Sequence, residues 1–319
     1  MHGVPRARVA AGTPLNPGTM SAASLLQEIV RSRLTAVQRD GFEATRAEME
    51  RAPAPLRFSN LLSLTSRHAR DSTALSPSAD ERAQVERETG GVELERWTLL
   101  EAARVALLLA RPDLAQDAGA RALEEAFRYA DEGELRALYR SLAFLPGGER
   151  FLWRTGEGCR TNMRSVFEAA ALDTPYPARW FEEIGWRSVA IKCVFVGAPL
   201  WRLEGLDRRL SEDLARMALD LVEERRSAGR PVQPDLWLCL GRHGGERALA
   251  ALLRELEPTN PHRLGRRAAA YGLSRAGEFE RLRLLAATET DPHVSSALLE
   301  GAERSVEACV FRSLDPTGT

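Results

Sequence analysis

The scarcity of isoleucine is the feature that most restricts the fold of this chain of 319 residues. Isoleucine occurs only at Ile29, Ile184 and Ile191, valine is sparse, and alanine, leucine, arginine and glutamate dominate. β-Branched residues favour strands, whereas the abundant residues here are strong helix formers. The sequence therefore predicts an all-α protein built from stacked helical hairpins, with no β-sheet of three or more strands.

Charge and hydropathy exclude several classes of protein. Charged residues make up 28% of the chain, but the net charge is only -1. This balance argues against a nucleic-acid binder and leaves no polybasic anchor for a membrane. The most apolar stretch, residues 189–201, contains Lys192 and Pro199 and is too short to span a bilayer. Residues 1–20 hold no apolar run of signal-peptide length, so we expect a cytoplasmic protein that is not an integral membrane protein.

The chain divides by composition into an extension and one continuous helical domain. Residues 1–20 are rich in Pro, Gly, Ala and Thr and are predicted to be disordered, with Met20 as an alternative start to Met1. Helical periodicity begins at Ser21. Within the domain we expect an N-terminal helical region, a motif core and C-terminal helical repeats, at residues 21–148, 149–240 and 241–319.

Individual helices follow from the same periodicity. Residues 97–110 are apolar on most sides and predict a buried helix. Residues 157–172 and 178–195 each predict one further helix. Residues 70–91 are polar and contain Pro77 and a Gly-Gly pair, so they are interpreted as a loop with at most one helical turn.

The C-terminal part shows a weak internal repeat. Asn260-Pro261-His262 and Asp291-Pro292-His293 lie 31 residues apart, and each offers a helix N-cap followed by a proline at the first helical position. A helix pair recurring at this spacing favours a HEAT-like α-solenoid. The alternative is an irregular helical bundle whose helices share the same caps.

Standard catalytic and metal-binding motifs are absent from the sequence. There is no Walker loop, GxGxxG, HExxH or GxSxG motif. No two of the five histidines have metal-ligand spacing on a helix, so no metal and no cofactor are expected. The four cysteines are predicted to be reduced and buried, because none form a CxxC pair and each lies in or beside an apolar stretch. They are Cys159, Cys193, Cys239 and Cys309.

One segment combines polar residues with an apolar frame. On a helix, Arg160, Arg164 and Glu168 stack four residues apart, with Met163 and Phe167 on the core-facing side. Arg164 and Glu168 can pair, which leaves Arg160 free to bind an anion or to cap a neighbouring turn. The alternative is a solvated charged stripe.

The turn that follows has two interpretations as well. Asp173 precedes Pro175-Tyr176-Pro177 and can bind a ligand, or it can simply accept backbone N–H groups while the prolines fix a corner between helices.

Lys192 is the only lysine among 44 basic residues. In a buried position its pKa would fall, which suits a nucleophile or an acid–base group. The alternative is a lysine that extends from a helix edge into solvent. We expect its helix to pack beside the Arg160–Glu168 helix, and Lys192 to find Glu168 or Asp173 as its carboxylate partner. The apolar contacts would come from Met163, Phe167, Val189 and Cys193.

The segment resembles the EboA family of bacterial proteins over residues 159–237. The matching residues are Arg160-Thr161-Asn162-Met163-Arg164-Ser165-Val166-Phe167-Glu168, Leu172-Asp173, Pro175-Tyr176-Pro177, Lys192, Phe195-Val196-Gly197, Pro199-Leu200, Gly205-Leu206-Asp207, Leu214-Ala215-Arg216-Met217, Glu224-Arg225-Arg226 and Ala228-Gly229-Arg230-Pro231-Val232. The resemblance implies a role in metabolite traffic, encoded in the ebo gene cluster for secondary metabolism, in which a biosynthetic precursor is exported. It implies no established reaction.

Two classes of function follow. The first is a non-catalytic adaptor or ligand carrier whose partners are other proteins of the ebo cluster or a small metabolite. The alternative is an enzyme that acts on a small anionic metabolite through Arg160, Glu168, Asp173 and Lys192. The candidate ligand-binding residues are Arg160, Asn162, Arg164, Glu168, Asp173, Tyr176 and Lys192.

The composition of residues 1–20 generates a first prediction. Deletion of residues 1–19 should leave the midpoint of thermal unfolding unchanged, because disordered residues contribute few contacts. Differential scanning calorimetry of the full-length and shortened chains checks this. A decrease of several degrees would show that the segment packs on the helices.

Overall fold

The described part of the chain, residues 21–314 of a computed structural model, is built from helices. Its only strand-like pairing is an isolated bridge between Ala74 and Thr98, so the prediction of an all-α fold without a β-sheet is confirmed for these residues. The predicted disorder of residues 1–20 lies outside the described residues.

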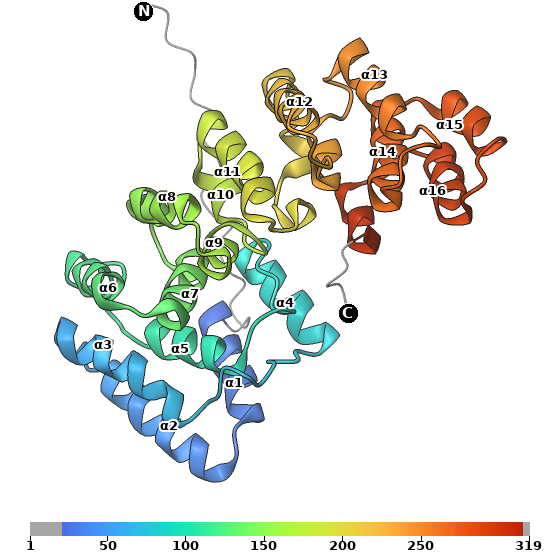
Figure 1. The fold of residues 1–319 in the computed structure, drawn as a ribbon. Helices are drawn as coiled ribbons and strands as arrows, with labels where there is room; N and C mark the ends of the chain where they lie inside the picture. Colours follow the sequence, from blue (N-terminus) through green and yellow to red (C-terminus); the bar gives the residue numbers. More distant parts are fainter. Residues whose placement is uncertain (1–20, 315–319) are drawn as a thin grey trace, which may run out of the picture.

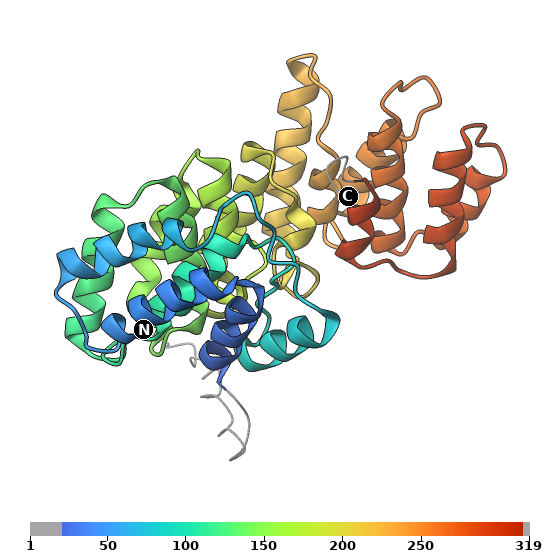
Figure 2. The same ribbon diagram turned by 90° about the horizontal axis from the view of Figure 1, so that it is seen from below.

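The first eleven helices gather into one part of the molecule, and α12–α16 extend from it (Figures 1 and 2). The first part contains α1 (Ala22–Arg33), α2 (Ala36–Met49), α3 (Pro55–Leu64), α4 (Ala79–Thr89), α5 (Leu99–Leu109), α6 (Asp117–Tyr129), α7 (Glu132–Ser141), α8 (Leu152–Arg160), α9 (Arg164–Ala171), α10 (Tyr176–Trp180) and α11 (Glu183–Val196). The second contains α12 (Glu212–Ser227), α13 (Gly245–Glu255), α14 (Arg263–Ala276), α15 (Phe279–Ala286) and α16 (Pro292–Glu303).

Short 3₁₀ helices fill the connections. They are η1 (Thr65–Arg67), η2 (Leu142–Phe144), η3 (Gly148–Phe151), η4 (Leu200–Arg202), η5 (Leu206–Arg208), η6 (Pro234–Cys239) and η7 (Ala308–Leu314). η4 packs against both η6 and η7, and η6 and η7 each pack against α14. These contacts connect the two parts of the molecule. The HEAT-like repeat over residues 241–319 stays a prediction.

Helix α5 forms the centre of the first part. Every residue from Leu99 to Leu108 is buried, and the helix packs against α1, α2, α3 and α7. A helix that is apolar on most sides must be covered by neighbouring elements on those sides. This confirms the buried helix predicted at residues 97–110.

A buried carboxylate at the start of α5 ties it to α7. The Glu101 side chain is fully buried, and its Oε1 accepts from the Nε of Arg136 (2.8 Å) and the Nε of Arg140 (3.1 Å). Its Oε2 accepts from the N–H of Thr98 (2.8 Å), which completes a capping box. The Arg140 guanidinium also lies over the ring of Trp97, 5.1 Å from its centroid.

Helix α4 corrects the prediction of a loop at residues 70–91. Ser78 and Glu81 form a capping box at its start, and Gly90 closes it in the left-handed conformation with φ of 71°. Only Val85 and Thr89 of the helix are buried, so its apolar periodicity is faint. The capping residues at its two ends, rather than the hydrophobic pattern, indicate this helix.

Two of the predicted long helices are each divided in two. Residues 157–172 form α8 and α9, because Thr161 is extended and its hydroxyl accepts from the N–H of Met163. Residues 178–195 form α10 and α11, separated by the extended Phe181 and Glu182. Met163 therefore lies in a connection and is 44% exposed, which corrects its predicted place in the core.

Only one of the two predicted helix caps in the C-terminal part is present. Asp291 caps α16 with Pro292 at the first position, as predicted. Asn260 instead accepts from the N–H of His262, and α14 starts only at Arg263.

All four cysteines are free, as predicted, and three are buried, but Cys309 is exposed, which corrects its predicted burial.

The Glu101 cluster generates a second prediction. Burial alone would raise the pKa of Glu101, but Arg140, the Thr98 N–H and Arg136 together hold it below its usual value. The ionised carboxylate therefore stabilises the fold at neutral pH, and this contribution is lost as the pH falls through the lowered pKa.

Glu101→Gln should lower the free energy of unfolding by about 3 kcal/mol at pH 7. The difference from wild type should shrink below about pH 4, where the unfolded carboxyl takes up its proton. Urea titrations at pH 7 and pH 3.5 measure both values. Glu48→Gln, which breaks an exposed pair with Arg57, is the control and should change stability little. Equal losses for the two variants would contradict this account.

Candidate functional site

The connection between α8 and α9 presents the first candidate residues. Arg164 is the first residue of α9, and its Nε donates to Oε1 of Glu168 one turn later at 2.7 Å. The predicted pairing of these two residues is confirmed. Arg164 is half exposed, so this part of the pair lies at the surface.

The pair continues inward through Arg202 of η4. Nη1 of Arg202 donates to Oε2 of Glu168 at 2.6 Å, and its Nε lies 3.0 Å and 3.2 Å from the two carboxylate oxygens of Asp173. The exposed fraction of the side chains falls from 49% at Arg164 to 19%, 4% and 1% at Glu168, Arg202 and Asp173. We call these four residues the ion-pair chain. It leads from solvent into the core.

The backbone of Asp173 is also fixed. Its φ of 56° is left-handed, a conformation that aspartate tolerates better than most residues. Its N–H donates to the carbonyl of Arg202 (3.3 Å), and its carbonyl accepts from the N–H of Glu93 (3.0 Å). Asp173 thus joins the segment before α5, the end of α9 and η4.

Charge within the ion-pair chain is balanced. Burial would raise the pKa of Glu168, but Arg164 and Arg202 hold it below its usual value. Burial would lower the pKa of Arg202, but Asp173 and Glu168 raise it well above the usual arginine value. Glu168 and Arg202 are therefore both charged at neutral pH, and the ion-pair chain matches two arginines with two carboxyl side chains.

A pocket of about 290 Å³ opens beside the outer end of the ion-pair chain. We call it the Arg164 pocket. Its lining residues are Arg164, Val194, Gly197, Ala198, Pro199, Trp201, Gln233, Pro234, Asp235, Leu264, Phe311 and Leu314. Most of them are apolar, and its one acidic lining residue in the described chain, Asp235, accepts from the N–H of Leu200 at 2.8 Å. An apolar cavity with a few polar groups is the usual form of a small-molecule site.

Trp201 forms a wall that is held by two arginines. The guanidinium carbons of Arg96 and Arg312 lie 5.2 Å and 6.0 Å from the centroid of its ring. The Nε1 atom of Trp201 is buried and has no acceptor among the residues that the structure describes. A buried indole N–H usually finds a partner, so Trp201 is an exception to this tendency among the described residues.

Lys192 does not meet a carboxylate. Its Nζ donates to Oδ1 of Asn162 at 2.6 Å, so the prediction of a pair with Glu168 or Asp173 is wrong. The break at Thr161 is the reason, because it turns Asn162 toward α11 while Glu168 continues along α9. α11 packs against α8, and its Val189 and Cys193 are buried as expected.

The remaining two candidates lie apart from the pocket. Arg160 is exposed and forms an ion pair with Glu157 within α8. Tyr176 is buried, and its hydroxyl donates to the carbonyl of Gly148. Burial raises the pKa of Tyr176 to about 12. Its contacts are those of a residue that holds α10 against η3.

Sequence reasoning missed Arg202 and Trp201. Both directly follow the matched Pro199-Leu200 pair, and this position was the available signal. Nothing in the local pattern separates Arg202 from the other arginines, because its partners are 29 and 34 positions away in the chain. The pocket could not be predicted either, since Leu264 and Phe311 reach it only through the packing of α14 and η7.

Two further properties of the described residues concern metal ligands and membrane-spanning helices. No group of three or more His, Cys, Asp and Glu side chains in residues 21–314 is placed to hold a metal ion. Within the same range, every helix is too short or too polar to cross a membrane.

Fold and site together define a helical protein in which an ion-pair chain runs from the surface into the core beside a mostly apolar pocket. A family model described as "Metabolite traffic protein EboA" matches residues 22–241. The chain belongs to the EboA family. The match begins far before the motif-rich segment and includes α1–α12, so the N-terminal helices are part of the family unit. No curated protein and no solved structure shows significant similarity to the chain.

The ion-pair chain generates a third prediction. Arg202→Met should lower the free energy of unfolding by about 3–5 kcal/mol, because it leaves Asp173 buried without a counter-ion. Arg164→Met removes only the exposed end and should cost about 1 kcal/mol or less. The double variant Asp173→Asn, Arg202→Met should recover part of the loss. Urea unfolding of the three variants measures these differences, and a single Arg202 variant as stable as wild type would refute the role of the chain.

Proposed function

We propose that this protein is a non-catalytic helical carrier in metabolite traffic, and that the Arg164 pocket holds a small molecule with an apolar body and one anionic group. We further propose that it works in the cytoplasm on a precursor of secondary metabolism, with other proteins of its gene cluster as partners. The general role rests on family membership. The ligand class rests on the pocket.

Arg164 is the observation that carries the proposal. Its guanidinium lines the pocket but uses only Nε for Glu168, and its two Nη atoms have no acceptor among the described residues. Glu168 holds the side chain in place, so little further ordering is needed when a ligand arrives. A guanidinium with two free nitrogen atoms can bind a carboxylate or phosphate through two parallel hydrogen bonds.

The apolar walls supply the other half of the recognition. Trp201, Leu264 and Phe311 surround the space beside Arg164. Their contact with an apolar body would stabilise the complex by about 25 cal/mol for each Å² removed from water. A volume of about 290 Å³ limits the ligand to a small molecule or to one part of a larger one.

The alternative of an enzyme receives less support from the geometry. It requires Arg160, Glu168, Asp173 and Lys192 to act on one substrate. Arg160 pairs with Glu157 at the surface, and Lys192 bonds to Asn162. Asp173 and Glu168 share Arg202, but Asp173 is covered by protein. The four groups therefore do not face one cavity.

The carrier proposal generates a fourth prediction. Isothermal titration calorimetry should detect octanoate binding to the wild-type protein, and Arg164→Gln should weaken it about tenfold or more, because a charge-assisted hydrogen bond contributes about 1.5–3 kcal/mol. Octan-1-ol lacks the charge, so its affinity should be the same for both proteins. Arg160→Gln is the matched control, since it removes an exposed, ion-paired arginine outside the pocket.

A second measurement uses the natural ligand. The protein purified from its own cells is extracted with organic solvent, and the extract is analysed by mass spectrometry. An anionic metabolite should accompany the wild type and the Arg160 variant but not the Arg164 variant. Octanoate affinity that is independent of Arg164, together with identical extracts from all three proteins, would refute the proposal.

A further inference from the structure

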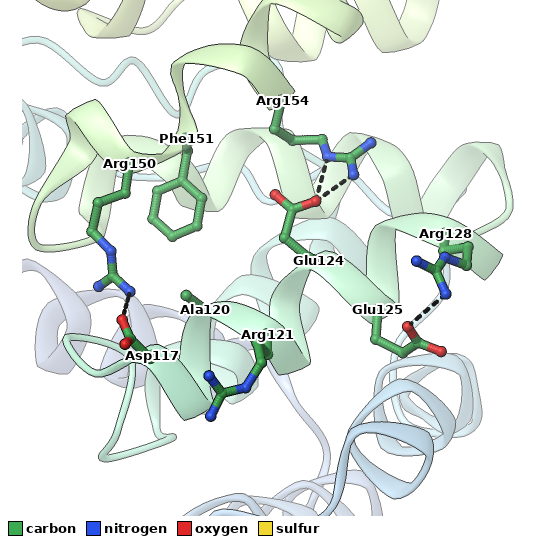
Figure 3. Close-up of a pocket in the computed structure, with 9 residues that line it drawn as sticks. All are labelled: Asp117, Ala120, Arg121, Glu124, Glu125, Arg128, Arg150, Phe151 and Arg154. Atoms are coloured by element: carbon green, nitrogen blue, oxygen red, sulfur yellow. Dashed lines mark hydrogen bonds and ion pairs between the residues drawn. The ribbon is translucent and has the colours of Figure 1, made fainter.

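A second surface lies on α3, α6 and α8, away from the Arg164 pocket. A hollow of about 450 Å³ separates α6 from η3 and α8 (Figure 3). Its lining residues are Asp117, Ala120, Arg121, Glu124, Glu125, Arg128, Arg150, Phe151 and Arg154. This α6–α8 hollow is open and strongly charged, unlike the Arg164 pocket.

The charges of the α6–α8 hollow balance except at one residue. Asp117 pairs with Arg150 (3.3 Å) and Glu125 with Arg128 (3.2 Å). Figure 3 also shows the pair between Glu124 and Arg154, in which Nε lies 3.1 Å from the carboxylate. Arg121 is exposed and has no partner among the described residues. One uncompensated positive charge therefore remains in the hollow.

An adjoining hollow of about 190 Å³ lies between α3, α6 and α7. Its lining residues are Leu56, Ser59, Asn60, Leu62, Ser63, Glu125, Ala126, Tyr129, Ala130, Glu134 and Leu138. Glu125 lines both hollows, so they form one continuous surface across α6. The carboxylate of Glu134 in this α3–α6 hollow is engaged by Ser63 and Arg104, so it adds no free charge.

Two large exposed side chains line the α3–α6 hollow, and a third contacts Arg154, which lines the α6–α8 hollow. Leu56 and Tyr129 are 73% and 71% exposed and line the α3–α6 hollow. Trp153 is 63% exposed, and the guanidinium of Arg154 stacks between Trp153 (4.7 Å) and Phe127 (4.9 Å). Tryptophan, tyrosine and arginine are enriched among the residues that contribute most binding energy at protein–protein interfaces.

We propose that this surface docks an acidic amphipathic helix of a partner protein. The apolar side of that helix would cover Leu56 and Tyr129, and one of its carboxylates would meet Arg121. Arg121 and Tyr129 are two helical turns apart on α6, about 12 Å, so the partner's carboxylate and its apolar anchor lie about seven or eight residues apart. This inference concerns a different surface from the Arg164 pocket and stands independently of the proposed carrier function.

Site-specific photo-cross-linking in the protein's own cells tests the proposal. A benzophenone amino acid replaces Tyr129 or Trp153 in the full-length chain, and cross-linked peptides are sequenced. The control replaces Ile184, which is 73% exposed on α11. The expected result is one partner protein cross-linked from Tyr129 and Trp153 but not from Ile184, through a segment with the acidic amphipathic pattern.

The charge is tested separately with that segment as a synthetic peptide. Arg121→Glu should weaken its binding about tenfold or more in fluorescence anisotropy, because it sets like charges against each other. Arg304→Glu is the control, since Arg304 is an exposed arginine at the end of α16 whose side chain has no partner among the described residues. Cross-links to a second copy of this chain, cross-links to a basic segment, no cross-link specific to Tyr129 and Trp153, or equal effects of the two charge reversals would each overturn the proposal.

Discussion

The guanidinium of Arg202 is the interaction on which the arrangement around the site depends. Its side chain is 4% exposed and lies between the carboxylates of Glu168 and Asp173. A buried charge without a partner is very costly, so these three groups must come together in one geometry or not be buried at all. Because they belong to α9, the following turn and η4, their pairing fixes three chain segments at once. Trp201 precedes Arg202 in η4 and is thereby set as a wall of the Arg164 pocket.

The order of burial along the ion-pair chain separates the buried structural pairs from the arginine that we propose binds a ligand. Arg202 uses its polar atoms on Asp173 and Glu168, and both Arg202 and Asp173 are covered by protein. Arg164 differs from them, because only one of its nitrogen atoms is hydrogen-bonded and the other two remain free beside an apolar space. An anchored arginine loses less side-chain entropy on binding an anion than a free one does. The inner pairs thus make a rigid support for the outer arginine, to which the proposal assigns the anionic group of the ligand.

Local signals in the sequence were sufficient for most of the helices but not for the site. The buried helix α5 follows directly from its apolar residues. The prediction of a loop at the position of α4 was wrong because it did not take the capping box of Ser78 and Glu81 into account. A capping box indicates a helix even where few apolar residues are present. Within the site, Arg164–Glu168 is a contact one turn apart and was predictable. The partner of Lys192 was not, because a break of three residues after Arg160 redirects the chain.

The residues that line the Arg164 pocket come partly from inside and partly from outside the segment that matches the family model. Arg164 and Trp201 lie within residues 22–241, whereas Leu264 and Phe311 come from the helices that follow. Phe311 is itself positioned by Tyr271 of α14, with ring centroids 6.0 Å apart. A ligand that contacts both walls gains binding energy only while η7 remains packed on η4 and on α14, and by linkage it stabilises that packing. The charged half of the proposed recognition therefore belongs to the family unit, and the apolar half that shapes the ligand's body depends on how the C-terminal helices of this chain pack.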